Sequence, residues 1–590
     1  MLTGCHGLRH ADLQVRCRAA YSLLRITEGL EPKAFLLLSH VNKFADIILH
    51  TGSFLGFGNN VKPQLQQSLL TESAELHLLE ATSLITRPKP LAALTSVVPH
   101  REWDKASYVS GTQEEQEEQQ RQLQQRQLAV LHELSSVLVK QVQTFLSHKD
   151  MNRFASEIAE ATAHKISCLA SLAKGLTSRS LAEHSSMFEH AAMVVVAACN
   201  SLGGHAVVRA KTVIFLHRMV AMLGSDVLKL LGHMYPALLQ HSDSTDTDHV
   251  VQVLNQVMVE FQSQSRPLID AVFGITCDKF EDLLQRFETA QMENRWFAEQ
   301  ASRSALAGLG IAADGNREPI AEAPHIDLER ATLQRQYVVF LQHVVTQNSE
   351  VVLLSPANQH RLEGVLAHLL GAIRGQGIKV NLPTSPSNGS LSPNARNKTS
   401  EMPRISIQAS LPMRKCAIAA LIGLCKAWEP AALQDTQRAP TLPLQLVHAF
   451  RNFMFDKALP LCLGGMVTGY SLDSWSQGNS DSSTGSSLSS FGNSLQRCEV
   501  PGLRLNLADA QTQNIVLEVG SLLHTATQAY GKEHMVGYLQ QALPLFGWGA
   551  NSTQALLNLI MDSGLNGIST AAQLMPFKEH FKKIFRSCTN

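Results

Sequence analysis

The segment HVVQVLNQVMVEFQS at residues 249–263 has the spacing of apolar side chains that is typical of an α-helix. These side chains recur at intervals of four, three and four residues, and such intervals return to the same face of a helix. We therefore predict an amphipathic helix that buries this face against other parts of the chain. The predicted buried face consists of Val250, Leu254, Val257 and Phe261.

Similar blocks follow one another along most of the 590 residues, separated by short polar or proline-containing breaks. Further helices are indicated at 414–428, at 510–530 before the helix-ending Gly531, and at the C-terminus, where a helix opens near Pro576. Because convincing period-2 strands are absent, the sequence predicts an all-α fold. The other blocks are 12–30, 33–51, 69–86, 120–148, 153–174, 187–200, 205–223, 227–241 and 268–289.

Pairs of these blocks give units of roughly 40 residues, which is the period of HEAT-type helical repeats. We therefore predict a HEAT-repeat-like α-solenoid, a superhelical array of antiparallel helix pairs. The Gln/Glu-rich run at 113–127 is read as a solvated helical extension.

Two stretches rich in Ser, Asn and Pro lack the apolar area needed to join a core, so we expect disordered loop insertions there. The predicted organisation is helical repeats at 1–375, a disordered insertion at 376–410, helical repeats at 411–470, a Ser-rich disordered insertion at 471–500 and C-terminal helical repeats at 501–590.

The composition limits the class of protein. Lys and Arg total 50, as do Asp and Glu, so the formal net charge is +0. This balance excludes a polybasic carrier or an acidic tail protein, but it allows a local basic face. The ten cysteines include no Cys-x-x-Cys pair, and their low density favours a reducing compartment. The longest apolar run, 191–199, is about half of a bilayer span. We expect a soluble intracellular chain with no membrane partner.

Motifs for catalysis, cofactors or metals are missing, so we predict no enzyme, no cofactor and no metal site. His132-Glu133 lacks the second histidine that would place two imidazoles on one helical face for zinc. The 24 histidines are dispersed without matched spacing. Three aspartates resemble half of a calcium loop but lack its glycine and closing glutamate, and an N-cap cluster explains them better. They are Asp243, Asp246 and Asp248.

Basic side chains on the predicted helices are the remaining functional candidates. Several recur at helical spacing and so share a face, as Arg18 and Arg25 do. On a single helix such a face is usually solvated and forms local ion pairs, for example between Lys583 and Glu579. Brought together on one wall, however, these cations would neutralise phosphates. The candidate phosphate-binding residues are Arg18, Arg25, Lys211, Arg218, Arg414, Lys415, Lys578, Lys582 and Arg586.

An ordered series of blocks resembles exportin-T, the tRNA export receptor of the importin-β superfamily. The blocks are HADLQVRCRAAYSLLRITEGL (10–30), TVIFLHRMVAML (212–223), VLNQVMVEFQSQSRPLI (253–269), LERATLQRQYVVFLQHVVTQ (328–347), RKCAIAALIGLCKAW (414–428) and LADAQTQNIVLEVGSLLHTATQAYGKEHMVGYLQ (507–540). No single block is a diagnostic motif, and it is their order that carries the resemblance. The resemblance covers roughly the C-terminal half of such a receptor, so we expect a truncated or shortened relative.

The resemblance implies a karyopherin that binds mature tRNA together with RanGTP and contacts nucleoporins. It would shuttle between nucleus and cytoplasm through the nuclear pore and catalyse no reaction. The N-terminal repeats with which family members grip Ran have no counterpart in this chain, so the tRNA partner is the better supported of the two. The alternative function is a HEAT-type scaffold that assembles protein partners without RNA, which the neutral charge slightly favours.

Overall fold

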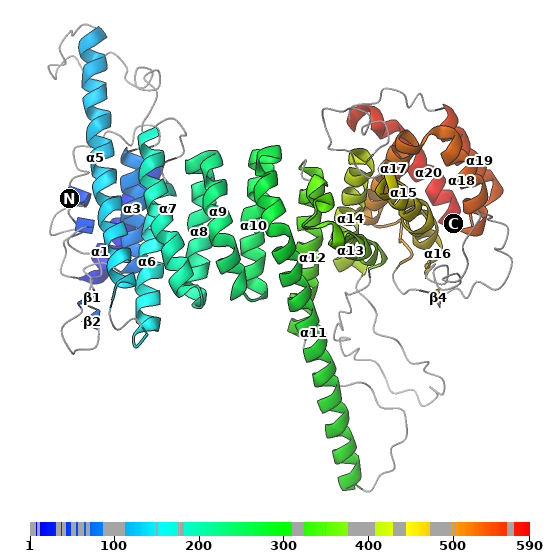
Figure 1. Ribbon diagram of the computed structural model, residues 1–590, viewed down its shortest axis with the longest axis horizontal. Helices are drawn as coiled ribbons and strands as arrows, with labels where there is room; N and C mark the ends of the chain where they lie inside the picture. The colour runs from blue at the N-terminus through cyan, green and yellow to red at the C-terminus, as the bar shows by residue number, and fades with distance from the viewer. Residues whose placement is uncertain are drawn as a thin grey trace. The chain divides into compact units, whose positions relative to one another are not determined.

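The computed structural model confirms the all-α, solenoid-type fold, with helices packed in adjacent pairs (Figure 1). The chain divides into two compact units, Met1–Leu268 and Ile269–Asn590. This boundary falls inside the predicted block 1–375. The structure describes residues 8, 12–30, 37, 43–45, 47–48, 55–56, 64–65, 71–86, 113–148, 152–174, 176, 182–309, 324–347, 350–375, 407–428, 444–471, 498–499, 503–562 and 571–589.

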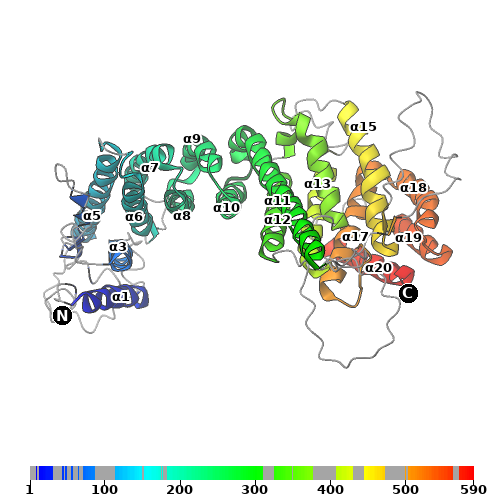
Figure 2. The ribbon, with the colours of Figure 1, turned by 90° about the horizontal axis from the view of Figure 1, so that it is seen from below.

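The first unit contains two layers of helices, which Figure 2 shows in cross-section. In the first layer each helix packs on the next in the order α1 (Leu13–Gly29), α3 (Glu72–Thr86), α6 (Ala155–Lys174), α8 (Ala206–Leu223) and α10 (Ser244–Phe261). The second layer contains α5 (Gln113–Leu146), α7 (Ala182–Leu202) and α9 (Val227–Gln240). Outside these layers, β1 (Leu55–Gly56) pairs antiparallel with β2 (Gln64–Leu65).

Helix α10 shows how the local sequence fixes an element. All four residues of its predicted apolar face are buried. The helix begins at Ser244 rather than near 249, because Asp243 is the N-cap and its side chain accepts a 2.8 Å hydrogen bond from the Asp246 amide. The predicted capping role is therefore confirmed for Asp243 alone, because the helix starts five residues earlier than expected and Asp246 and Asp248 lie inside it.

Arg209 of α8 joins three helices of the first unit. Its guanidinium is buried and donates two hydrogen bonds to Asp246 Oδ2 in the first turn of α10, at 2.8 and 2.5 Å. It also donates to the carbonyl oxygens of Gly203 and Gly204, which follow α7, at 2.8 and 3.0 Å. One side chain therefore supplies hydrogen-bond donors to the carbonyls that follow α7 and holds the first turn of α10 through Asp246.

The second unit is also a stack of paired helices. The described core of α11 (Arg266–Leu309) packs on α12 (Pro324–Thr346) through aromatic rings, with the Phe280 and Tyr337 centroids 4.8 Å apart. Helix α12 then packs on α14 (Ile407–Ala427), α14 on α17 (Ala510–Tyr530) and α17 on α20 (Ala571–Thr589). The remaining helices are α13 (Leu362–Arg374), α15 (Leu444–Phe453), α16 (Met466–Thr468), α18 (Lys532–Leu545) and α19 (Ala550–Asp562), and β3 (Tyr470–Ser471) pairs antiparallel with β4 (Cys498–Glu499).

Several predicted boundaries in this unit are wrong. Helix α11 continues past 289 because the sequence beyond it is rich in helix-favouring Ala, Gln, Glu and Arg. Helix α14 begins at Ile407, inside the predicted insertion 376–410, and α20 begins at Ala571, which places Pro576 within the helix. The predicted insertion 471–500 likewise begins and ends with strand residues, at Ser471 and Cys498–Glu499. The rest of the two predicted insertions, 376–406, 472–497 and residue 500, lies outside the described residues.

Two π-helical segments, η7 (Met454–Ala458) and η8 (Leu461–Gly465), interrupt the helix between α15 and α16. In a π-helix each carbonyl accepts a hydrogen bond from the N–H five residues later. For Phe455 that residue is Pro460, which has no N–H. The Tyr538 hydroxyl donates to the Phe455 carbonyl oxygen instead, at 2.9 Å. In the second segment the Trp548 indole N–H donates to the Leu463 carbonyl oxygen at 2.9 Å. A side chain of α18 and one from the loop between α18 and α19 thus satisfy carbonyls within the π-helical segments.

Replacing Trp548 by Phe is expected to lower the free energy of unfolding by about 1–3 kcal/mol, because the buried carbonyl of Leu463 loses its indole donor. Urea titration followed by far-UV circular dichroism measures this loss. The matched control is Trp296→Phe in α11, because the side chain of Trp296 is 54% exposed. Equal stability of the Trp548 variant and the control would contradict the role given to the indole N–H.

Candidate nucleic-acid interface

Helix α1 carries a stripe of basic and aromatic side chains, which we call the α1 stripe: Arg18, Tyr21 and Arg25. Arg18 is exposed, and Tyr21 is 52% exposed with its ring edge against His77 at 5.5 Å between centroids. Arg25 forms a 2.6 Å ion pair with Glu28 one turn on, and its side chain remains 63% exposed. The two cations therefore flank an exposed aromatic ring on one face of the helix.

Helix α8 repeats this arrangement in the α8 stripe: Lys211, Ile214 and Arg218. Lys211 is half-buried, Arg218 is exposed, and Ile214 between them is 48% exposed. The opposite side of α8 is buried, as the sequence predicts for Val208, Phe215, Met219 and Met222. The α8 stripe has the same sequence spacing as the α1 stripe, with a cation, an apolar residue three positions on and a second cation four positions further.

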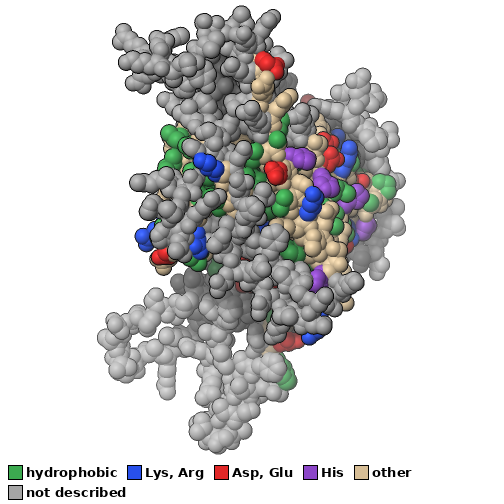
Figure 3. All heavy atoms as spheres, turned by 90° about the vertical axis from the view of Figure 1, so that its left-hand side faces the viewer, with side chains coloured by type: hydrophobic (Ala, Val, Ile, Leu, Met, Phe, Trp, Pro, Cys, Tyr) green, Lys and Arg blue, Asp and Glu red, His purple; other side chains and the backbone are tan. Residues whose placement is uncertain are grey.

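The two stripes lie on helices of one layer, with α3 and α6 between them in the packing order. Glutamates interrupt the basic surface, since Glu157 and Glu160 of α6 are both exposed. Figure 3 shows one end face of the molecule, on which the described basic, acidic and histidine side chains are interspersed rather than separated by sign. The described side chains that are visible on this face therefore include no continuous basic wall.

The five other candidates lie in the second unit. On α20, Lys578 and Arg586 are half-buried, whereas the side chain of Lys582 is only 15% exposed and forms a 2.6 Å ion pair with Glu579. The sequence assigned this glutamate to Lys583. Residues three and four positions apart are both neighbours on a helix, and in the structure it is Lys582, three residues after Glu579, that forms the pair. Lys415 of α14 is exposed.

Arg414 is wrongly assigned as a phosphate-binding residue. Its side chain is 1% exposed, and burial lowers its pKa to about 10. The guanidinium lies against Gly375, the left-handed residue that ends α13, and Nη2 donates to the Arg374 carbonyl oxygen at 3.5 Å. A side chain at Gly375 would meet this guanidinium. Arg414 therefore hydrogen-bonds a carbonyl at the C-terminal end of α13, where the helix dipole favours a positive charge. It is removed from the candidate phosphate-binding residues.

The structure also brings together a group of ligand-type side chains that the sequence did not indicate. Glu75 of α3 and His164 and Cys168 of α6 are buried, and one potential ligand atom from each lies within 4.8 Å of the others. The prediction rested only on the spacing of histidines along the chain, whereas this group is formed by residues of two different helices. The only sequence signal was the four-residue spacing of His164 and Cys168, because Glu75 is 89 positions from His164.

Stacked helix pairs that present cationic stripes on one layer define an α-helical repeat protein suited to holding a partner along its surface. Comparison with known proteins shows a similarity to one family of transport receptors over part of the chain. Residues 114–288 match the family model described as Exportin-T. The chain is also 27% identical over 184 residues to Exportin-T of Oryza sativa subsp. japonica, an alignment that covers 31% of this chain and 16% of that protein.

These matches confirm the resemblance to exportin-T over part of the chain, and the alignment spans less than a fifth of that relative's length. The family match contains α5 to α10 and the first part of α11, and so includes the α8 stripe. Two of the blocks that carried the resemblance, 212–223 and 253–269, lie inside it. Within the described residues, no helix combines the length and apolarity needed to cross a bilayer.

Proposed function

We propose that this chain is the tRNA-binding part of a nuclear export receptor of the exportin-T type. The observation that carries the proposal is the family match over residues 114–288, which contains the exposed α8 stripe. Its cations, Lys211 and Arg218, would contact phosphates, and Ile214 between them would pack against sugar. Such contacts read the shape and backbone of an RNA rather than its sequence.

The α1 stripe supplies the same chemistry at the other end of the layer. Arg18 and Arg25 would contact phosphates, while the exposed ring of Tyr21 offers a surface on which an unpaired base stacks. A folded RNA with two separated phosphate tracks suits two separated stripes better than a continuous basic surface would. Lys415, Lys578, Lys582 and Arg586 of the second unit remain candidates for further backbone contacts.

Removing the cations of the α8 stripe tests this function. The double substitution Lys211→Ala with Arg218→Ala is expected to lower the slope of log affinity against log salt by about 1.5, because each lost phosphate contact lowers it by about 0.7–0.9. Binding at about 0.15 M salt weakens by more than about 10-fold. Fluorescence anisotropy of a labelled tRNA over a salt series measures both quantities.

The matched control removes the same charge from the other layer. Lys140 of α5 and Lys229 of α9 are both exposed, and Lys140→Ala with Lys229→Ala is expected to leave affinity and slope close to those of the unmodified chain. If the two double variants change tRNA affinity and its salt slope equally, the loss reflects overall charge, and the α8 stripe is not part of the tRNA interface. A chain that binds no tRNA at low salt would favour the protein scaffold.

The remaining parts of the proposed transport cycle are separate from tRNA binding. They comprise RanGTP as a second partner, nucleoporin contacts and shuttling between nucleus and cytoplasm. If Ran and tRNA are linked, each raises the affinity of the other by the same factor. A tRNA titration with and without RanGTP therefore tests the Ran part without affecting the conclusion on tRNA.

A further inference from the structure

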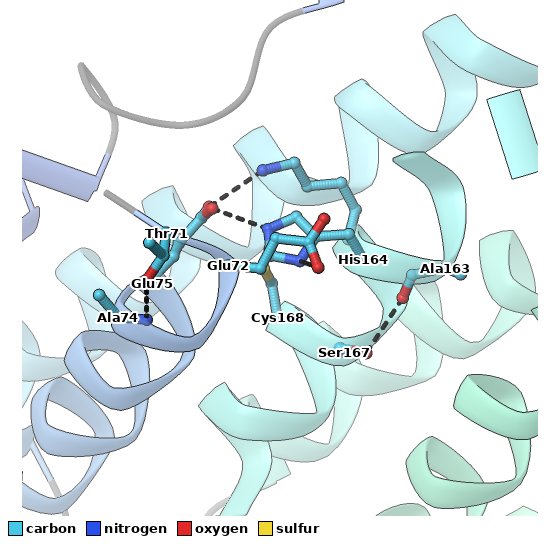
Figure 4. Close-up of polar contacts among 9 residues, drawn as sticks. Thr71, Glu72, Ala74, Glu75, Ala163, His164, Ser167 and Cys168 are labelled. Atoms are coloured by element: carbon cyan, nitrogen blue, oxygen red, sulfur yellow. Dashed lines mark hydrogen bonds and ion pairs between the residues drawn. The ribbon is translucent and has the colours of Figure 1, made fainter. Parts of the chain in front are cut away.

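The buried polar group between α3 and α6 is unusual for an array of apolar helices. Glu75, His164 and Lys165 are 1%, 7% and 1% exposed, and Cys168 is fully buried. Glu75 Oε2 lies 2.8 Å from His164 Nε2, and Lys165 Nζ donates to Glu75 Oε1 at 3.0 Å. Figure 4 shows the side chains of Glu75, His164 and Cys168 converging from the two helices. The group lies within the first unit, and none of its residues belongs to a cationic stripe.

Helix geometry brings these atoms together. His164 and Cys168 are four residues apart on α6 and so project from one face, with Cys168 Sγ 3.6 Å from His164 Nε2. Glu75 reaches the same point from α3, which packs directly on α6. One carboxylate oxygen, one imidazole nitrogen and one sulfur therefore surround a single position. Oxygen, nitrogen and sulfur are the three ligand types that proteins use for zinc.

The polar contacts of this group indicate which atoms face the shared position. Lys165 Nζ donates to Glu75 Oε1, and the other carboxylate oxygen, Oε2, lies 2.8 Å from His164 Nε2. Cys168 Sγ lies 3.6 Å from the same nitrogen. Oε2, Nε2 and Sγ are therefore the three atoms that could hold one ion.

We propose that Glu75, His164 and Cys168 bind one zinc ion, with water as the fourth ligand. On binding, the Cys168 thiol releases one proton to solvent and binds zinc as a thiolate, while His164 binds through Nε2 as a neutral ring that carries its proton on Nδ1. The carboxylate of Glu72 lies 4.0 Å from Nδ1 and would accept that proton in a hydrogen bond. Lys165 stays on Oε1, so Glu75 binds through Oε2 alone.

Two of the three distances between the ligand atoms are already close to those of a zinc site, and the third, between Glu75 Oε2 and Cys168 Sγ, is no more than 4.8 Å. Tetrahedral zinc with bonds of about 2.0–2.3 Å separates its ligands by roughly 3.3–3.7 Å. The sulfur and nitrogen already have this separation at 3.6 Å. The carboxylate oxygen and the nitrogen, now 2.8 Å apart, must separate by roughly half an ångström, which a side-chain rotation supplies. The mixed nitrogen and sulfur ligands exclude calcium and magnesium, which bind oxygen.

Titration of the full chain with cobalt(II), which takes the same tetrahedral ligands, tests the site. We expect one equivalent to bind with a thiolate-to-cobalt charge-transfer band, and one equivalent of zinc to displace it. Cys168→Ser should remove the band, while Cys199→Ser, a change at another buried cysteine of the same unit, should retain it. Absence of the band in the unmodified chain, or its retention in Cys168→Ser, would overturn the proposal.

A second variant avoids any question of folding, because the side chain of Glu72 is 74% exposed. Glu72→Gln weakens the accepted hydrogen bond to His164 Nδ1 and is expected to lower zinc affinity about 10-fold, as changes in outer-shell partners do. The control is Glu157→Gln, an exposed glutamate on α6. Competition with a chromophoric chelator measures both affinities. Equal zinc affinity in Glu72→Gln and the unmodified chain would overturn the orientation assigned to His164, and with it the site.

Discussion

Replacing Arg209 by Ala is expected to lower the free energy of unfolding of the first unit by about 3–5 kcal/mol, because removing one partner of a buried ion pair leaves the other charge uncompensated. Arg209 is 4% exposed and makes four hydrogen bonds, two of them to the buried carboxylate of Asp246. The substitution also leaves the carbonyls of Gly203 and Gly204 without this donor. Urea titration of the variant, followed by circular dichroism, measures the loss.

Two further variants separate charge from geometry. Arg209→Lys keeps the positive charge but cannot reach both Asp246 and the carbonyls after α7, so we expect it to recover only part of the stability. Arg218→Ala removes an exposed arginine from the same helix and should change the free energy of unfolding by about 0.5 kcal/mol or less. Losses of similar size in Arg209→Ala and Arg218→Ala would contradict the anchoring role of Arg209.

Disrupting the buried pair of Glu75 and Lys165 is the second large effect that we expect. Glu75→Leu leaves the charge of Lys165 buried without its carboxylate partner. Lys165→Met leaves the Glu75 carboxylate with only one of its two partners, His164. Each single substitution should cost about 3–5 kcal/mol, whereas the double variant should cost much less than the sum, because no uncompensated charge remains. Thermal or urea unfolding in the presence of a chelator measures the metal-free protein.

An exposed pair supplies the comparison. Arg25 and Glu28 on α1 are 2.6 Å apart but largely in solvent, and Arg25→Ala should cost less than about 1 kcal/mol. The comparison distinguishes burial from mere proximity, because the two pairs have similar distances and different surroundings. Additive losses in the Glu75 and Lys165 variants would show that the two charges do not depend on one another.

Much of the fold could be predicted because helical spacing is a local property. The apolar face of α10 and the capping by Asp243 follow from residues within one helix, and the structure confirms both. The boundaries that failed depend on information beyond apolar spacing. In α11 helix propensity extends the element past its apolar face, and in α20 the surrounding helix accommodates Pro576.

The candidate site was less predictable because it depends on what packs against each helix. Arg414 and Lys415 are neighbours in sequence, yet one is buried against the end of α13 and the other is exposed. Nothing in the local pattern distinguishes them. Glu75 and His164 lie 89 positions apart, and only the packing of α3 on α6 joins them. The exposed residues between the cations, Tyr21 and Ile214, could have been found from the repeated spacing alone.

The pairing of β3 with β4 has a consequence for how this chain can be altered. Tyr470 lies opposite Glu499 and Ser471 opposite Cys498, so the backbone departs from and rejoins the helical stack at one point. Whatever replaces 472–497 need only begin and end there, and doubling the length of a flexible replacement costs only about 0.6 kcal/mol in closure entropy. This junction is therefore a natural place to graft a reporter domain or an affinity tag while leaving the helices on either side in register.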